Sequence, residues 1–195
     1  MSQPTAPAEK HPASAPPRST PFVICLTGFM GSGKTSVGQE LAQQLGCDFI
    51  DLDRMIEARA GKSVAGIFAQ QGEEFFRRAE REALAEVLST RRRPLVLSPG
   101  GGAWLQPGIA EQLAKAGAIT IFLDAPAEEL HQRCVNSLDA GHRPLLKDLS
   151  SFKKLYADRL PVYRRSQRRV DTSGRSVRDI ATGIAEIIRD EARDS

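Results

Sequence analysis

Residues 22–35 read FVICLTGFMGSGKT, a short apolar run that leads directly into a glycine-rich loop. From Gly28 to Thr35 the loop matches the pattern GxxxxGKT, and the amphipathic stretch KTSVGQELAQQLG follows at residues 34–46. The apolar run predicts a buried strand and the amphipathic stretch a helix, which is the context this pattern needs in order to bind phosphate. The glycines allow backbone N–H groups to face phosphate oxygens, and the helix N-terminus adds partial positive charge. This stretch therefore predicts a nucleotide-binding P-loop.

Two side chains of the loop have the chemistry expected of such a site. Lys34 can reach the β- and γ-phosphates of a nucleotide, and the Thr35 hydroxyl can ligate Mg²⁺. A guanine-reading NKxD segment is absent from the sequence, and the nearest string, NSLD at residues 136–139, lacks the lysine. The sequence therefore favours ATP over GTP.

The rest of the chain alternates short apolar runs with longer amphipathic stretches, which is typical of βαβ units and a parallel sheet. Strands are expected at residues 21–28, 47–53, 94–102, 118–126 and 168–174, the last as a weak edge strand. Helices are expected at residues 34–46, 54–61, 63–72, 72–93, 106–117, 127–138, 151–167 and 176–195. Pro161 should kink or interrupt the helix that contains it. The pattern predicts an α/β fold, a three-layer α/β/α sandwich with ligands at the carboxyl ends of five strands.

Composition limits the class of protein. The 195 residues include 27 Lys and Arg against 24 Asp and Glu, and the net charge of +3 weakens a nucleic-acid role. Three widely spaced cysteines without a CxxC pair argue against disulfides and a cysteine-based zinc site, and favour a cytoplasmic protein. The longest strongly apolar run, residues 22–26, is too short to cross a bilayer, and no signal peptide is recognised, so no membrane role is expected.

The N-terminal segment differs in composition from the rest of the chain. Residues 1–21 contain six of the twelve prolines and no aromatic residue. Such a segment cannot offset its ordering entropy by burial, so a disordered extension is expected, with a docking or targeting role as the alternative. Residues 22–195 are expected to form one domain.

Two carboxylates follow the second expected strand. Asp51 and Asp53 stand in the string DLD, and their spacing points both side chains the same way if the strand continues through Leu52. A phosphoryl-transfer enzyme needs one acid near Mg²⁺ and another to orient, or take a proton from, the attacking hydroxyl. We assign Asp51 to the metal and Asp53 to the hydroxyl. The alternative is that Asp53 merely caps the helix that follows.

Arginines and glycines supply the remaining candidates. Arg77 lies beside Phe76 near the start of a long helix, where a guanidinium could bind a carboxylate at two points or simply face solvent. Arg159, in YADRLPVY, has the same two interpretations. Gly100 to Gly102 follow the third expected strand, where they either allow close approach of a substrate or form a plain turn.

A polar stretch that includes GHRPLL suggests a moving segment. Residues 136–149 are of the length and composition of an active-site lid. Arg143 is the expected working residue of this lid, since its charge could offset that of the transition state. His142 is expected to face solvent.

Taken in order, GFMGSGKTSVG, DLD, GEEFFRRAE, PGGGA, HRPLL and RLPVYR resemble the shikimate kinase family. The resemblance extends over nearly the whole chain from about Phe22. It implies a nucleoside monophosphate kinase-like P-loop domain with strand order 2-3-1-4-5, and a monomer. The implied reaction transfers the ATP γ-phosphoryl group to the 3-hydroxyl of shikimate, in aromatic amino-acid biosynthesis. Shikimate carries a carboxylate and hydroxyls, which two arginines, an aspartate and exposed backbone would complement.

The resemblance also implies a role for each matching residue. ATP phosphates would be held by Gly31, Ser32, Gly33, Lys34, Thr35 and Ser36, and Mg²⁺ by Thr35 and Asp51. Shikimate would be bound by Asp53, Arg77, Gly100, Gly101, Gly102 and Arg159. Lys34, Asp53 and Arg143 would be catalytic, with Asp53 as the candidate base. Arg133 and Arg175 would flank the adenine, and Arg143 would also contact ATP.

Three other functions stay open at this point. The chain could be a P-loop kinase that acts on gluconate or a nucleoside monophosphate. It could be a regulator that binds ATP without phosphoryl transfer. It could also be a nucleic-acid-associated ATPase that uses the arginine cluster at residues 164–169, which otherwise reads as a solvated helix end.

Overall fold

The computed structural model describes residues 23–136, 148–191 and 193. The expected N-terminal extension, residues 1–21, lies outside these described ranges. Most of the expected lid, including Arg143 and His142, also lies outside them.

The five expected strands form one sheet in which every pair is parallel. They are β1 (Val23–Thr27), β2 (Asp48–Asp51), β3 (Leu95–Ser98), β4 (Ala118–Asp124) and β5 (Arg168–Asp171). Their order across the sheet is β2-β3-β1-β4-β5, so the predicted order is confirmed. Because β1 lies at the centre, the loop that follows it opens at the middle of the carboxyl edge of the sheet.

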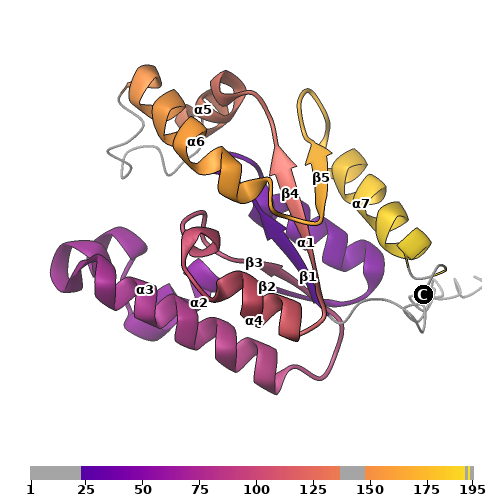
Figure 1. Ribbon diagram of the computed structural model, residues 1–195, viewed down its shortest axis with the longest axis horizontal. Helices are drawn as coiled ribbons and strands as arrows, with labels where there is room; N and C mark the ends of the chain where they lie inside the picture. Colours follow the sequence, from indigo (N-terminus) through magenta and orange to yellow (C-terminus); the bar gives the residue numbers. More distant parts are fainter. Residues whose placement is uncertain (1–22, 137–147, 192, 194–195) are drawn as a thin grey trace, which may run out of the picture.

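Helices cover both faces of the sheet, as predicted (Figure 1). Over the described residues these are α1 (Lys34–Leu45), α2 (Leu52–Ala60), α3 (Val64–Thr90), α4 (Ile109–Lys115), α5 (Ala127–Val135), α6 (Leu149–Tyr163) and α7 (Val177–Glu191), with a short 3-10 helix η1 (Ala103–Leu105). Among these described helices, none is both long and apolar enough to cross a membrane.

Alternation along the central strand divides the core in two. Val23 and Cys25 of β1 face one cluster, which includes apolar residues of α2 to α6. Ile24 and Leu26 face the other cluster, which is closed by α1 and α7 lying side by side. Successive side chains of a strand point to opposite faces, so a continuous apolar run is what a sheet buried on both faces requires.

The helices expected at residues 63–72 and 72–93 meet at a sharp break within α3, where Gly72 has a non-helical backbone (φ 83°, ψ 171°), so the predicted division at this glycine is confirmed. One helix differs from the prediction. Helix α6 is not interrupted at Pro161, but ends two residues later at Tyr163. The proline stands close enough to the end of α6 for the helix to finish its last turn.

Candidate active site

The P-loop connects β1 to α1 at the carboxyl edge of the sheet. Gly28, Gly31 and Gly33 have φ values of 147°, 79° and 86°, which L side chains rarely adopt. At Gly31 a Cβ would also lie 2.4 Å from the carbonyl oxygen of Leu130 in α5. The glycine pattern is therefore required both by the turn and by the close approach of α5.

Polar groups of this loop are arranged for an anion. The Lys34 Nζ atom donates to the carbonyl oxygens of Gly28 and Phe29 at 2.9 and 3.1 Å, which folds the ammonium group back over the loop. The Ser32 hydroxyl is buried and has no hydrogen-bond partner among the described residues. A buried hydroxyl without a partner is costly, so a phosphate oxygen at this position would satisfy it. The loop thus fits the predicted nucleotide phosphates.

Thr35 and Asp51 are brought together from two elements. The Thr35 hydroxyl donates to Asp51 Oδ2 at 2.6 Å, and the other carboxylate oxygen of Asp51 accepts from the Arg54 N–H at 3.3 Å. Hydroxyl and carboxylate oxygens are the donors that Mg²⁺ prefers, and this ion usually takes only one or two protein ligands beside substrate phosphates and water. The pair therefore fits the metal role expected of it.

The expectation that Asp51 and Asp53 share a strand is wrong. Strand β2 ends at Asp51, and Leu52 and Asp53 already lie in α2. Asp51 is the residue that caps this helix, which also removes the alternative that Asp53 is the cap. The reason is local, since the free N–H groups of a first helical turn recruit the preceding aspartate.

Asp53 is half-buried at the start of α2. Burial raises the pKa of its carboxyl to about 6, the negative charge of Asp51 adds to the rise, and the positive charges of Lys34 and Arg77 oppose it. Its Oδ1 atom has no hydrogen-bond partner among the described residues. A carboxylate that titrates near neutrality and has an unused oxygen is suited to accept a proton.

The glycines after β3 bring Asp53 and Arg77 into one pocket. A Cβ at Gly100 would lie 2.5 Å from Asp53 Oδ1, and a Cβ at Gly102 would lie 2.5 Å from Arg77 Nη2. Both side chains therefore rest on the backbone of this short loop, where a larger residue would displace them.

Arg77 is held by two carboxylates of its own helix. Its Nη1 donates to Glu80 at 2.6 Å, and its Nε and Nη2 donate to Glu73 at 3.2 and 3.1 Å. The guanidinium also lies over the rings of Phe68 and Phe76. The side chain is only 20% exposed, so the interpretation of Arg77 as a solvated surface arginine is wrong.

Glu80 is a polar residue of this site whose role the sequence did not reveal. It is 1% exposed, and burial raises the pKa of its carboxyl to about 6, while the bond from Arg77 opposes this rise. A Cβ at Gly100 would lie 2.9 Å from its Oε1. The only signal in the sequence is its position three residues after Arg77, which places the two side chains on one helix face.

Arg159 approaches the same pocket from α6. Its guanidinium lies over the ring of Phe29, a residue of the P-loop, with 5.6 Å between Cζ and the ring centre. Burial raises the pKa of the Tyr163 phenol, and the charges of Arg159 and Arg77 both oppose that rise. The Tyr163 hydroxyl donates to the carbonyl oxygen of Gly101 at 2.5 Å. Two arginines thus act on a tyrosine that anchors the glycine loop, Gly100 to Gly102. Nothing in the sequence pattern pointed to Tyr163.

The arginines expected at the adenine both lie at the turn after β5, Arg133 bonding to it from α5 and Arg175 forming part of it. Arg133 donates to the Thr172 hydroxyl at 3.0 Å and carbonyl at 2.7 Å, and forms an ion pair with Glu129. Arg175 is exposed and donates to the carbonyl oxygens of Asp171 and Asp179. Arg133 thus bonds to the turn itself, whereas Arg175 bonds to the end of β5 and to α7.

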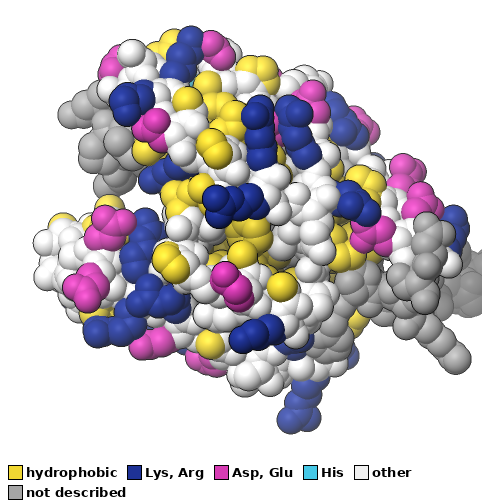
Figure 2. All heavy atoms as spheres, in the orientation of Figure 1, with side chains coloured by type: hydrophobic (Ala, Val, Ile, Leu, Met, Phe, Trp, Pro, Cys, Tyr) yellow, Lys and Arg dark blue, Asp and Glu magenta, His cyan; other side chains and the backbone are white. Residues whose placement is uncertain are grey.

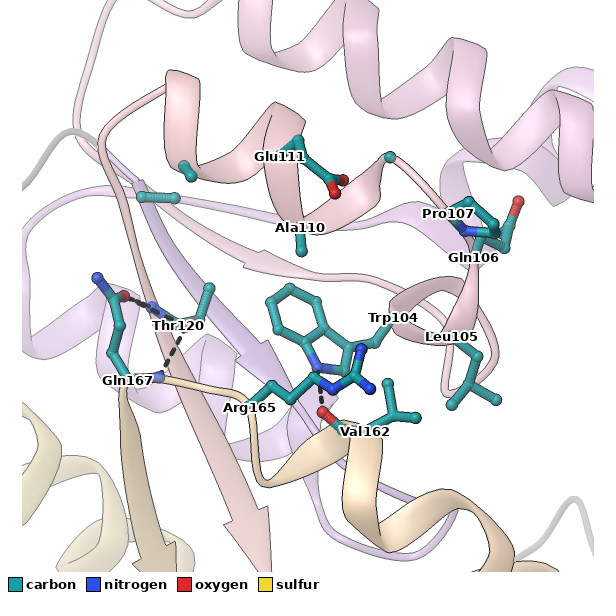
Figure 3. Close-up of a pocket in the computed structure, with 13 residues that line it drawn as sticks. Trp104, Leu105, Gln106, Pro107, Ala110, Glu111, Thr120, Val162, Arg165 and Gln167 are labelled. Atoms are coloured by element: carbon teal, nitrogen blue, oxygen red, sulfur yellow. Dashed lines mark hydrogen bonds between the residues drawn. The ribbon is translucent and has the colours of Figure 1, made fainter.

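A separate cavity of about 510 Å³ lies beyond η1 (Figure 3). Trp104, Gln106, Thr120 and Arg165 are among its lining residues, and none of the predicted site residues lines it. The predicted site is thus a different place, formed by the P-loop, the glycine loop and the side chains around them.

Comparison with known proteins agrees with this geometry. The family model described as "Shikimate kinase" matches residues 30–189. A shikimate kinase of Thermus thermophilus is 42% identical over 173 residues, which cover 87% of this chain and 91% of the relative.

Solved structures give the same result. The structure described as shikimate kinase from Acinetobacter baumannii in complex with shikimate has a TM-score of 0.78 and is 35% identical in sequence. The match covers 92% of this chain and 96% of that chain. A gluconokinase from Sinorhizobium meliloti, at 20% identity and a TM-score of 0.57, shares the fold. This match covers 91% of this chain and 97% of the gluconokinase chain. Since the match extends over both the P-loop and the glycine loop, the chain belongs to the shikimate kinase family of ATP-dependent P-loop kinases.

Proposed function

We propose that this protein transfers the γ-phosphoryl group of ATP to the 3-hydroxyl of shikimate and releases 3-phosphoshikimate and ADP. The observation that carries the proposal is the meeting of Asp53 and Arg77 on the Gly100 to Gly102 backbone, with the charge of Lys34 acting on Asp53. A base, a carboxylate-binding guanidinium and a phosphate-binding lysine thus stand in one pocket. In this proposal the protein acts as a cytoplasmic monomer.

The nucleotide side of the reaction falls to the P-loop. Residues Gly31 to Ser36 supply backbone N–H groups at the start of α1 for the phosphates, and the Ser32 hydroxyl gains the partner it lacks. Lys34 exchanges the Gly28 and Phe29 carbonyl oxygens for β- and γ-phosphate oxygens. Thr35 and Asp51 would hold Mg²⁺, which neutralises charge on the phosphates when it is bound.

The glycine loop and the side chains that rest on it bind the acceptor. Arg77 and Arg159 bind the shikimate carboxylate, and the small residues Gly100 to Gly102 leave room for its ring. Asp53 orients the attacking hydroxyl and accepts its proton as the oxygen to phosphorus bond forms. The positive charges of Lys34 and Arg77 favour the ionised form of Asp53 and so keep it ready as a base.

Three arginines complete the proposal. Arg133 and Arg175, which lie at the turn after β5, flank the adenine. Arg143 contacts ATP and offsets the negative charge that develops during transfer. These roles follow from the family resemblance, and for Arg133 and Arg175 also from their shared turn.

The proposal is tested by a coupled ADP-release assay with Mg-ATP and four acceptors: shikimate, quinate, gluconate and AMP. Turnover confined to shikimate, absent in Lys34→Ala, is the expected result. Turnover on gluconate or AMP alone would replace the acceptor assignment and leave the phosphate site intact. ATP binding without turnover on any acceptor would favour the regulator interpretation.

A further inference from the structure

Gln106 bonds to two side chains of α3, one of which lies in the pocket. It follows η1 directly and is half-buried at the edge of the cavity in Figure 3. Its Nε2 atom donates to Glu80 Oε2 at 2.8 Å, and its Oε1 atom accepts from Arg81 Nη1 at 2.8 Å. The side-chain amide thus joins two charged residues that are adjacent in sequence.

The orientation of this amide is fixed by its partners. A guanidinium can only donate, so the Gln106 oxygen must face Arg81, and its NH₂ group must then face Glu80. The reversed amide would set two donors against each other and an oxygen against a carboxylate. Arg81 therefore ensures that Gln106 supplies a donor to Glu80.

Glu80 depends on this donor. Its Oε1 atom has no hydrogen-bond partner among the described residues, so Oε2 receives both bonds, from Arg77 Nη1 and Gln106 Nε2. The carboxylate is 1% exposed and cannot recruit bulk water in place of a lost donor. Hydrogen bonds to a buried carboxylate stabilise its charged form, so loss of Gln106 would favour the neutral acid.

A neutral Glu80 would hold Arg77 less firmly, because the hydrogen bond from the guanidinium would lose its ionic partner. The other carboxylate that bonds Arg77, Glu73, is 68% exposed and is a weaker anchor. We propose that Gln106 is a positioning residue, which keeps Glu80 ionised and thereby orients Arg77 toward the carboxylate of the acceptor. This inference rests on the proposed function, because it concerns the acceptor side of that site.

The electrostatics around Glu80 support the proposal. Burial raises the pKa of Glu80 to about 6, the charge of Asp53 adds to the rise, and the bonds from Arg77 and Gln106 oppose it. Arg77 and Asp53 are the charged groups that act on Glu80 directly, and Arg81 acts through Gln106. A pKa near 6 leaves the carboxyl ionised at neutral pH by a narrow margin, so the loss of one donor has a measurable effect.

The experiment compares Gln106→Met, which keeps size and removes both hydrogen bonds, with Gln106→Glu, which keeps the acceptor for Arg81 and places a second carboxylate against Glu80. Gln167→Met is the matched control, since Gln167 accepts bonds from the Thr120 N–H and hydroxyl and none of its bonds reaches the pocket. The KM for shikimate, the KM for ATP and kcat are measured for each variant from pH 5 to pH 9.

For Gln106→Met the expected result is a rise of about tenfold in the KM for shikimate at pH 7, with the KM for ATP and kcat within about twofold of wild type. The acid limb of kcat/KM for shikimate should move up by about two pH units, because a tenfold loss of ionised Glu80 at pH 7 requires a rise of that size in its pKa. Asp53 contributes to the same limb, so the readout is the shift between variant and wild type. Gln106→Glu should show the larger rise in KM.

Arg81→Met tests the same chain of contacts without altering Gln106, and serves if Gln106→Met does not fold. It should raise the KM for shikimate by about threefold, because the amide is then free to turn. A rise in KM no larger than that of Gln167→Met, or an unmoved acid limb, would overturn the inference. Wild-type enzyme without shikimate turnover would instead overturn the proposed function, and the inference with it.

Discussion

A Cβ at Gly102 would lie 2.5 Å from Arg77 Nη2 and 2.6 Å from Nη1, so the guanidinium occupies the space that any larger residue would need. The backbone of Gly102 (φ −90°, ψ −18°) is one that alanine adopts without strain. A methyl group there would therefore displace the arginine and leave the chain in place.

Gly102→Ala is accordingly expected to raise the KM for shikimate by about tenfold or more, with little change in the KM for ATP or in thermal stability. Steady-state kinetics in both substrates and a thermal melt are the measurements. Gly66→Ala, on the first turn of α3, is the control, since a Cβ there would come no closer than 3.3 Å to another side chain, that of Ser63. Unchanged kinetics in Gly102→Ala would show that Arg77 does not bind the acceptor.

Asp53→Asn should lower kcat by about a hundredfold or more and leave the affinity for ATP nearly unchanged, since the amide cannot take a proton. In wild type the rate should fall as the pH drops through about 6, where the pKa of Asp53 lies. Single-turnover rates from pH 5 to pH 9 and ATP titration are the measurements. Full activity in the variant would remove Asp53 from the chemistry and favour a regulator.

Asp53→Asn should also stabilise the folded protein above neutrality. The folded pKa of about 6 exceeds the ordinary value of 3.8, so wild type loses stability as the pH rises through this interval. The variant escapes that loss, by about 1 to 3 kcal/mol at pH 7 and above, and gains nothing below about pH 4. Urea unfolding of both proteins at pH 4 and pH 8 measures the difference. An equal gain at both pH values would contradict the titration of Asp53.

Thr35→Val is expected to increase the Mg²⁺ concentration needed for half-maximal rate by about tenfold and to lower kcat, because the hydroxyl shared with Asp51 is removed. Thr35→Ser keeps the hydroxyl and should stay within a few-fold of wild type. Initial rates at fixed ATP across a Mg²⁺ series give both values. Equal Mg²⁺ dependence in the two variants would argue against a ligand at this position.

Arg77→Ala and Arg159→Ala should each raise the KM for shikimate about tenfold or more, and far more than the KM for ATP, because each removes a donor to the substrate carboxylate. Arg178→Ala, an exposed arginine of α7, is the control and should change neither value. A larger effect on ATP than on shikimate would contradict the carboxylate assignment.

Local patterns were sufficient to predict most of the fold. The GxxxxGKT loop could be located from the strand before it and the helix after it. Short apolar runs between amphipathic stretches identified all five strands. Residues Leu52 and Asp53 were misassigned because a strand end and a helix start compete for the same short string, and the capping bond from Asp51 decides between them.

The polar interior of the site could not be predicted in the same way. Glu80, Gln106 and Tyr163 meet the pocket from three different elements, and each has its role through a partner distant in sequence or on a neighbouring helical turn. Buried hydrogen bonds of this kind depend on tertiary packing. Motifs locate the residues that contact a ligand, whereas the residues that support them become visible only in three dimensions.

Phe29 belongs to the P-loop, yet its ring packs against Phe152, Tyr156 and Tyr163 and lies under the guanidinium of Arg159. The nucleotide and acceptor sites therefore share one aromatic wall. Any displacement of this ring by one substrate alters the free energy with which the other binds, and by linkage the effect must be equal in both directions. A substitution at Phe29 should thus appear as a change in the cooperativity between the two substrates.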